Sequence, residues 1–181
     1  MKLTDTKISQ EGAGAPTPSP SPRGGGAFAI DDLYSARILS LAANMPRAGR
    51  LAAPQGSAEK VSRLCGSKVT VDVALKDGVV SDFAQDVKAC ALGQASAAVL
   101  GANVIGATVQ EIEMARDAFR AMLKTGGPPP EGRFSDLEML APVKDYPPRH
   151  TSTLLAFEAV TEAVREATAK GGGRTSPAGA A

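Results

Sequence analysis

The clearest pattern in the sequence is an alternation of apolar and polar residues between positions 68 and 75. Valine occupies every second position from Val69 to Val73, and Leu75 continues the apolar series. The intervening positions carry lysine, threonine, aspartate and alanine. Because side chains on a strand point to opposite faces in turn, this period of two predicts a β-strand with an apolar face and a more polar one.

Two further strands are predicted beside this one. The pair Asp77-Gly78 suits the positive φ angles of a type I′ hairpin turn. Residues 79–88 then form the expected return strand, and a weaker candidate strand covers residues 58–64. The sequence therefore predicts a three-stranded antiparallel meander.

Apolar residues at helical spacing predict the remaining elements. A first helix precedes the sheet, and Pro46 and Gly49 end it. A helix of small residues follows the sheet over residues 91–105, and the capping box of Thr108 and Glu111 begins the next helix. The apolar positions of the first helix are Ile30, Leu33, Tyr34, Ile38 and Leu41.

The C-terminal part adds a short turn of helix over residues 134–140 and a final helix over residues 152–169. Pro147-Pro148 predicts an extended approach to that final helix. The order α-β-β-β-α-α-α predicts an α+β fold, in which helices pack on one face of a three-stranded antiparallel sheet.

Composition divides the chain into one domain and two tails. Residues 1–27 are rich in Ser, Pro, Gly and Ala, and residues 171–181 are similar. Such segments cannot bury enough apolar surface to offset the entropy of ordering, so we expect both tails to be disordered. Residues 28–170 remain as one domain of ordinary size.

Charge and composition narrow the classes of function. The net charge of +1 and the absence of Trp give no basic, aromatic surface for nucleic acid. No apolar run approaches the ~20 residues that a membrane span needs, and we see no apolar signal region at the N-terminus. Two cysteines without such a signal fit a reducing compartment, so we expect a cytoplasmic protein.

The two cysteines carry the candidate chemistry. Cys65 and Cys90 follow the first and third predicted strands. Because neighbouring strands of a meander bring their same-side ends together, we expect both thiols at one edge of the sheet. Cys90 also opens a predicted helix, whose N-terminus favours the thiolate. The alternative is that both are small buried core residues, and no Cys-x-x-Cys pair signals a zinc site.

Several segments resemble those of a known family. Residues 44–49 resemble an Asn-Pro-Arg-Asn-x-Gly turn, and Cys65-Gly66 resembles the start of a Cys-Gly-Asp motif. Residues 90–97 resemble a motif in which Ala-Ser follows a cysteine, and residues 146–149 resemble the start of a third region. Over about residues 30–168, the chain resembles the U-type iron–sulfur cluster assembly scaffolds, the NifU/IscU/SufU-like family.

The resemblance implies that Cys65 and Cys90 are metal ligands or sulfur acceptors. Where the family has an aspartate after its first cysteine, this chain has Ser67. The third cysteine of the family falls on Ser152 when the chains are aligned without gaps from Arg149. A neutral hydroxyl binds a soft metal or a cluster far more weakly than a thiolate or a carboxylate does. At most two of the usual four ligands are therefore retained, with Ser67 and Ser152 as further pocket residues.

Other polar residues lie near the implied site. His150 precedes Ser152 by two positions and is the only histidine, and its imidazole can bind zinc or iron. The alternative is that His150 packs beside the Pro-Pro segment. Asp145 and Lys88 are also close in the implied arrangement, although solvated surface charges are the simpler interpretation of both.

The resemblance also implies a function. Such a protein accepts sulfur from a cysteine desulfurase, holds iron and sulfide on its thiolates, and passes the cluster to an apo-protein acceptor. We therefore expect a scaffold rather than an enzyme, with an iron–sulfur cluster or iron as its cofactor. The insertion that ends near residues 134–143 is most like the SufU branch, which implies a zinc-dependent sulfur-transfer partner of a desulfurase as the first alternative. The second alternative is a metal-free interaction module that kept the fold.

Overall fold

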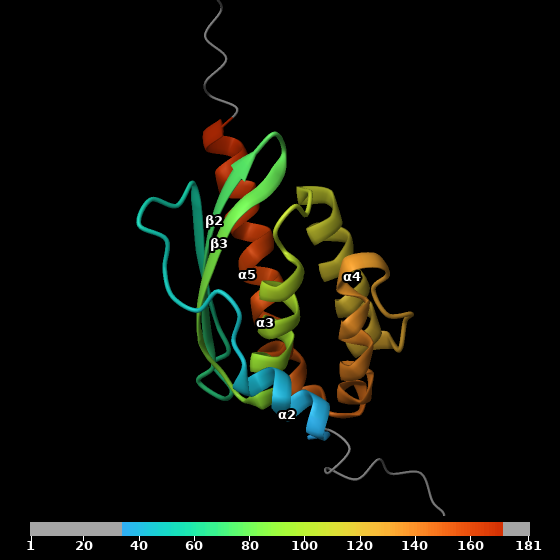
Figure 1. The fold of residues 1–181 in the computed structure, drawn as a ribbon. Coiled ribbons are helices and arrows are strands. Elements are labelled where there is room, and N and C mark those ends of the chain that lie inside the picture. The colour runs from blue at the N-terminus through green and yellow to red at the C-terminus, as the bar shows by residue number, and fades with distance from the viewer. Residues whose placement is uncertain (1–33, 172–181) are drawn as a thin grey trace, which may run out of the picture.

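Three antiparallel strands form one layer of the molecule, and helices cover one face of that layer (Figure 1). The computed structural model describes residues 34–171. The strands lie in the order β1-β2-β3, and the expected α+β fold is confirmed. Their bounds are Gly56–Val61 for β1, Lys68–Lys76 for β2 and Val79–Lys88 for β3.

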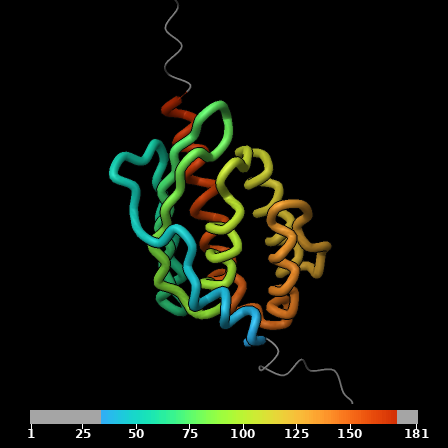
Figure 2. The backbone as a smooth tube through the Cα atoms, in the orientation of Figure 1, coloured from blue at the N-terminus to red at the C-terminus, as the bar shows by residue number. Residues whose placement is uncertain are grey.

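Helix α5 lies against β1 and β2, and α3 lies beside α5 (Figure 1). Helix α4 and the 3₁₀ segment η1 form the layer farthest from the sheet, and Figure 2 shows α2 crossing one end of α3. Within residues 34–171, no helix is both long and apolar enough to cross a membrane. The bounds are Ala36–Ala43 for α2, Ala91–Asn103 for α3, Val109–Thr125 for α4, Gly132–Asp145 for η1 and Pro147–Gly171 for α5.

Local sequence signals account for one hairpin turn and for the start of one helix. Asp77 and Gly78 both have positive φ angles, 53° and 79°, as the predicted hairpin turn between β2 and β3 requires. At the start of α4, Thr108 accepts a hydrogen bond from the backbone N–H of Glu111, and the Glu111 carboxylate accepts one from the N–H of Thr108. The predicted capping box is therefore confirmed.

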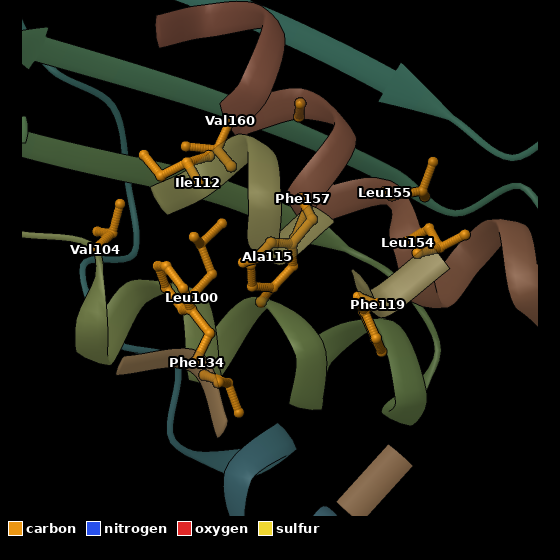
Figure 3. Close-up of a cluster of buried hydrophobic side chains, with 14 of the residues drawn as sticks. Leu100, Val104, Ile112, Ala115, Phe119, Phe134, Leu154, Leu155, Phe157 and Val160 are labelled. Carbon is orange, nitrogen blue, oxygen red and sulfur yellow. The ribbon is translucent and has the colours of Figure 1, made fainter. Parts of the chain in front are cut away.

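The core lies between the sheet and the helices. The valines of β2 that alternate from Val69 to Val73 are fully buried, as the pattern predicts. Between the helices, Phe157 of α5 meets Phe119 and Phe134 edge-on, with ring centroids 5.6 Å and 5.4 Å away (Figure 3). Edge-to-face packing suits the ring quadrupoles and joins α4, η1 and α5 into one apolar cluster.

The polar face of β2 is more buried than the alternation suggests. Asp72 is fully buried, because the segment between α2 and β1 crosses that face of the sheet. Burial alone would raise the pKa of Asp72, but hydrogen bonds from Arg50, from Ser57 Oγ and from the N–H of Leu51 lower it. The carboxylate thus fastens this long connection to the sheet.

Three sequence predictions are corrected by the structure. Within the described residues the first helix begins only at Ala36, because Ser35 caps it and Tyr34 lies outside it. The first strand covers residues 56–61 rather than 58–64. Pro147 begins α5 instead of leading to it through an extended segment, because the first turn of a helix needs no N–H donor and tolerates proline.

The predicted tails, 1–27 and 171–181, lie outside the described residues, apart from Gly171, which ends α5. Ile30 and Leu33 of the predicted first helix also lie outside them. Disorder of the tails and the bounds of the domain at residues 28–170 therefore stay predictions.

Candidate functional site

The antiparallel register brings both cysteines to one end of the sheet. Lys68, the first residue of β2, pairs with Lys88, the last residue of β3. Cys65 lies just before Lys68, in the turn that joins β1 to β2, and Cys90 lies just after Lys88. Both cysteines line one pocket of about 320 Å³. The other lining residues are Gly66, Ser67, Lys88, Ala89 and Arg149.

Cys65 is exposed, and hydroxyl groups surround its thiol. Its Sγ lies 3.4 Å from Ser62 Oγ and 3.1 Å from Ser67 Oγ. Hydrogen bonding to Ser62 above all, and then to Ser67, lowers the pKa of Cys65 to about 7 from its ordinary value of 9.0. Because the thiolate is the nucleophilic form, Cys65 is equipped to react near neutral pH.

Cys90 is the N-cap residue of α3, as predicted, but its side chain makes no hydrogen bond to the N–H groups of the first turn. Its half-buried thiol instead donates to Ser152 Oγ over 3.6 Å. Ser152 is fully buried on α5, and its hydroxyl donates to the carbonyl of Arg149 at 3.1 Å. Ser152 also makes the smallest of the contributions that lower the pKa of Cys65.

Close packing of α3 on α5 brings Ser152 to the thiols. Gly93 lies in the first turn of α3, and a Cβ at this position would be only 2.9 Å from the backbone oxygen of Ser152. Packed atoms do not approach so closely, so any side chain at position 93 would push α5 away from α3. Glycine here allows Cys90 and Ser152 to meet.

The charges that line the pocket are positive. Lys88 and Arg149 contribute the cations, and no carboxylate is among the lining residues. Across the part of the chain that the structure describes, no group of three or more His, Cys, Asp and Glu side chains is placed to hold a metal ion. The pocket lining thus combines two thiols, the Ser67 hydroxyl and two cations, and the buried Ser152 hydroxyl contacts Cys90.

Of the five candidate residues, the structure brings together Cys65, Ser67, Cys90 and Ser152 but not His150. The Nε2 atom of His150 lies 3.1 Å from each of the carbonyl oxygens of Val143 and Lys144, at the end of η1. His150 is not among the pocket-lining residues. Its imidazole is therefore occupied in joining the start of α5 to η1.

Lys88 and Asp145, the two charged residues expected near the site, differ in whether they line the pocket. Lys88 is exposed and lines the pocket, whereas Asp145 is exposed and does not line it. Thr151 is exposed on α5, in contrast to the buried Ser152 beside it. The geometry thus favours Ser152 over Thr151 as the position equivalent to the third cysteine of the resemblance.

The role of Ser62 was not evident from the sequence, which gave no reason for Cys65 to be activated. Ser62 closes the turn that carries Cys65, because its N–H donates to the carbonyl of Ser67 and its carbonyl accepts from the N–H of Gly66, both at 2.8 Å. This turn, rather than a helix dipole, surrounds the Cys65 thiol with hydroxyls. A serine three residues before a cysteine in a predicted turn is the only local signal, and it is a weak one.

We expect alkylation of Cys65 to follow its lowered pKa. In a Cys90→Ser variant, the rate of reaction with iodoacetamide should rise with pH and reach half its maximum near pH 7. Adding Ser62→Ala removes the strongest hydrogen bond, so the half-point should move to higher pH, whereas Ser135→Ala on η1 should leave it unchanged. A half-point near the ordinary value of 9.0 with Ser62 in place would contradict this account of the turn.

Fold and site together define an α+β protein that presents two cysteine thiols at one end of an antiparallel sheet. A model of the family described as "NifU-like N terminal domain" matches residues 33–153. The chain therefore belongs to the NifU-like N-terminal domain family, which confirms the resemblance drawn from the sequence.

The chain is similar to several known proteins. It is 56% identical to a nitrogen-fixing NifU-like protein (N-terminal) from Brucella abortus, whose crystal structure matches with a TM-score of 0.76 over 78% of this chain and 98% of that chain. It is 28% identical over 134 residues to the iron–sulfur cluster assembly scaffold protein IscU of Thermotoga maritima, a match that covers 74% of this chain and 94% of that protein.

A further solved structure shares the fold. It is described as an iron–sulfur cluster assembly scaffold protein for the SUF system and comes from Fervidobacterium islandicum AW-1, and its TM-score is 0.69 over 75% of this chain and 98% of that chain. Its identity with this chain is 24%, so the likeness concerns the fold alone.

Proposed function

We propose that this protein is a scaffold for iron–sulfur cluster assembly, and that it holds its iron and sulfide cargo through the thiolates of Cys65 and Cys90. The observation that carries the proposal is the convergence of these two thiols on one pocket. The name of the Thermotoga maritima relative supports the same role. On this proposal the protein is not an enzyme, and the cluster is its cargo.

Cys65 is the sulfur acceptor in this proposal. Its thiol is exposed and has a pKa of about 7, so a persulfide donor meets a reactive thiolate at neutral pH. The donor is a cysteine desulfurase and the recipients of the cluster are apo-proteins, both located in the cytoplasm.

The positive charges of the pocket suit this cargo. Sulfide and thiolate ligands are anionic, and Lys88 and Arg149 line the pocket in which they would gather. Attraction between opposite charges at close range stabilises such an assembly. The hydroxyls of Ser67 and Ser152 are weak ligands, so the cargo is held by fewer strong bonds and is released more readily.

A resident zinc ion does not fit the residues that are present. Structural zinc sites are tetrahedral and use four strong ligands, and catalytic zinc sites use three. The described residues supply two thiols here, and the imidazole of His150 is directed to backbone carbonyls. The zinc-dependent sulfur-transfer alternative is therefore less well supported than the scaffold.

Anaerobic reconstitution tests the proposal. The full chain is incubated with ferrous iron and sulfide, desalted, and examined by visible absorption and by iron and sulfide analysis. We expect a coloured species in the unmodified protein and its loss in the Cys65→Ser and Cys90→Ser variants, because serine cannot replace a thiolate. Arg63→Ser, in the same turn as Cys65 but outside the pocket lining, is the matched control and should keep the colour.

The outcome also separates the alternatives. Zinc bound stoichiometrically to the purified protein, without colour after reconstitution, would support the sulfur-transfer partner. Binding of neither would support the metal-free module. Colour retained when both cysteines are replaced would contradict the proposal, because the cargo would then lie elsewhere.

A further inference from the structure

We infer that Cys90 releases the sulfur accepted by Cys65 as free sulfide, by forming a disulfide between the two cysteines. This inference rests on the sulfur-accepting step of the proposed function. It assigns different roles to the two thiols. Cys65 receives a sulfane sulfur, and Cys90 reduces it to the oxidation state that a cluster needs.

The arrangement of the thiols carries the inference. Cys65 is exposed to an incoming donor, whereas Cys90 is half-buried in the same pocket. The Cys90 thiol contacts Ser152 Oγ at 3.6 Å, and both thiols line the same pocket of about 320 Å³. The first thiol is thus placed to meet a partner protein, and the second to meet the first.

The turn that carries Cys65 can adjust without loss of core packing. All four residues from Arg63 to Gly66 are exposed, including Leu64, whose side chain is 72% exposed. Two backbone hydrogen bonds between Ser62 and the residues after Cys65 close the turn. A shift of this turn toward Cys90 therefore removes no buried side chain from the core.

The chemical step balances without any other reactant. Cys65 starts as a persulfide anion, and Cys90 starts as a thiol. The sulfur of Cys90 attacks Cys65 Sγ, a sulfur–sulfur bond forms between the two cysteines, and the bond from Cys65 Sγ to the sulfane sulfur breaks. The proton of Cys90 goes to the departing sulfur, which leaves as hydrosulfide. The sulfane sulfur gains two electrons, and the two cysteine sulfurs together lose two.

The polar groups of the pocket favour this step. Lys88 and Arg149 stabilise the anionic persulfide and the departing hydrosulfide, and no lining carboxylate repels them. Ser67 contacts Cys65 Sγ at the position where the resemblance has an aspartate, and its hydroxyl can donate to an anionic sulfur. The substitution that weakens metal binding thus assists sulfur chemistry.

A reduction must follow each release of sulfide. The Cys65–Cys90 disulfide has to be returned to two thiols before another sulfur is accepted. Thiol–disulfide exchange with a dithiol reductant performs this conversion. Each sulfide released by this route therefore consumes one equivalent of a dithiol.

Inorganic polysulfide provides the test. The reduced full chain is treated anaerobically with a limiting amount of polysulfide, and intact mass and released sulfide are followed over time. We expect the unmodified protein to lose two hydrogens, to stay monomeric on a non-reducing gel and to release sulfide. The Cys90→Ser variant should instead gain and keep one sulfur atom on Cys65, and release no sulfide beyond that of the reagent. Thr151→Ser, beside Ser152 but exposed, should behave as the unmodified chain.

Three results would overturn the inference, and they are distinguishable. If the unmodified protein keeps the added sulfur as long as Cys90→Ser does, Cys90 does not resolve the persulfide, and sulfur acceptance by the scaffold still stands. If Cys90→Ser takes up no sulfur at all, Cys65 is not the acceptor, and the proposed function loses its first step as well. A disulfide-linked dimer would also exclude the reaction within one chain.

Discussion

Replacing Gly56 by alanine is expected to destabilise the protein by about 3 kcal/mol or more, at the upper end of what overpacking costs. Gly56 is the buried first residue of β1, where the strand lies against α5. A Cβ at this position would be 1.9 Å from the backbone oxygen of Ala163 and 2.8 Å from the backbone nitrogen of Ala167. Because both obstacles are backbone atoms, no change of side-chain rotamer relieves them, and α5 must move away from the sheet.

Chemical denaturation followed by circular dichroism measures this loss of stability. Gly171→Ala is the matched control, because it is the same substitution at the end of the same helix and an added Cβ there meets nothing within 4 Å. The control should change the free energy of unfolding by less than about 0.5 kcal/mol, as is usual for surface positions. Equal stability of the two variants would show that α5 does not rest on β1 through this contact.

The elements that the sequence predicted well are those whose signals are local. The alternation in β2 and the Asp77-Gly78 turn fix the hairpin, and the pair of Thr108 and Glu111 fixes the start of α4. Each signal lies within a few neighbouring residues, so no distant contact is needed to interpret it. The bounds of β3 were predicted correctly for the same reason.

The features that the sequence could not give depend on contacts between distant segments. Asp72 was placed on the more polar face of its strand, and the pattern could not show that Arg50 and Leu51 cross over it. Pro147 looked like the end of an extended segment because its position in the first turn of α5 depends on where that helix begins. The local pattern was incomplete in the first case, and in the second it led to a wrong prediction.

The candidate site likewise has features that the sequence could predict and features that it could not. The order of the strands was enough to predict that Cys65 and Cys90 lie at one end of the sheet. The resemblance to a family was needed to propose Ser67 and Ser152 as their neighbours. Neither could show that the hydroxyls of the turn lower the pKa of Cys65, or that His150 is held by the backbone of η1.

The double substitution Ser67→Asp and Ser152→Cys is expected to create a zinc site. Both serines lie against the two cysteines, at 3.1 Å from Cys65 Sγ and 3.6 Å from Cys90 Sγ respectively. The variant therefore offers three thiolates and one carboxylate in place of two thiolates and two hydroxyls, a set that suits tetrahedral zinc. Because zinc binds the folded chain, free zinc at one hundred times Kd should raise the free energy of unfolding by about 2.7 kcal/mol.

Isothermal titration with zinc and melting curves with and without zinc measure this gain. The matched control combines Ser67→Asp with Thr151→Cys. It has the same types of ligand, but its new thiol lies at an exposed position. It should bind zinc much more weakly than the double variant, and a gain in the control alone would mean that Thr151, not Ser152, is equivalent to the third cysteine. Adding His150→Ala to the double variant should leave zinc affinity unchanged, because the Nε2 atom of His150 is directed to the carbonyls of Val143 and Lys144. If affinity falls instead, the imidazole leaves those carbonyls to bind the metal, and the pocket has a fifth ligand that its metal-free geometry conceals.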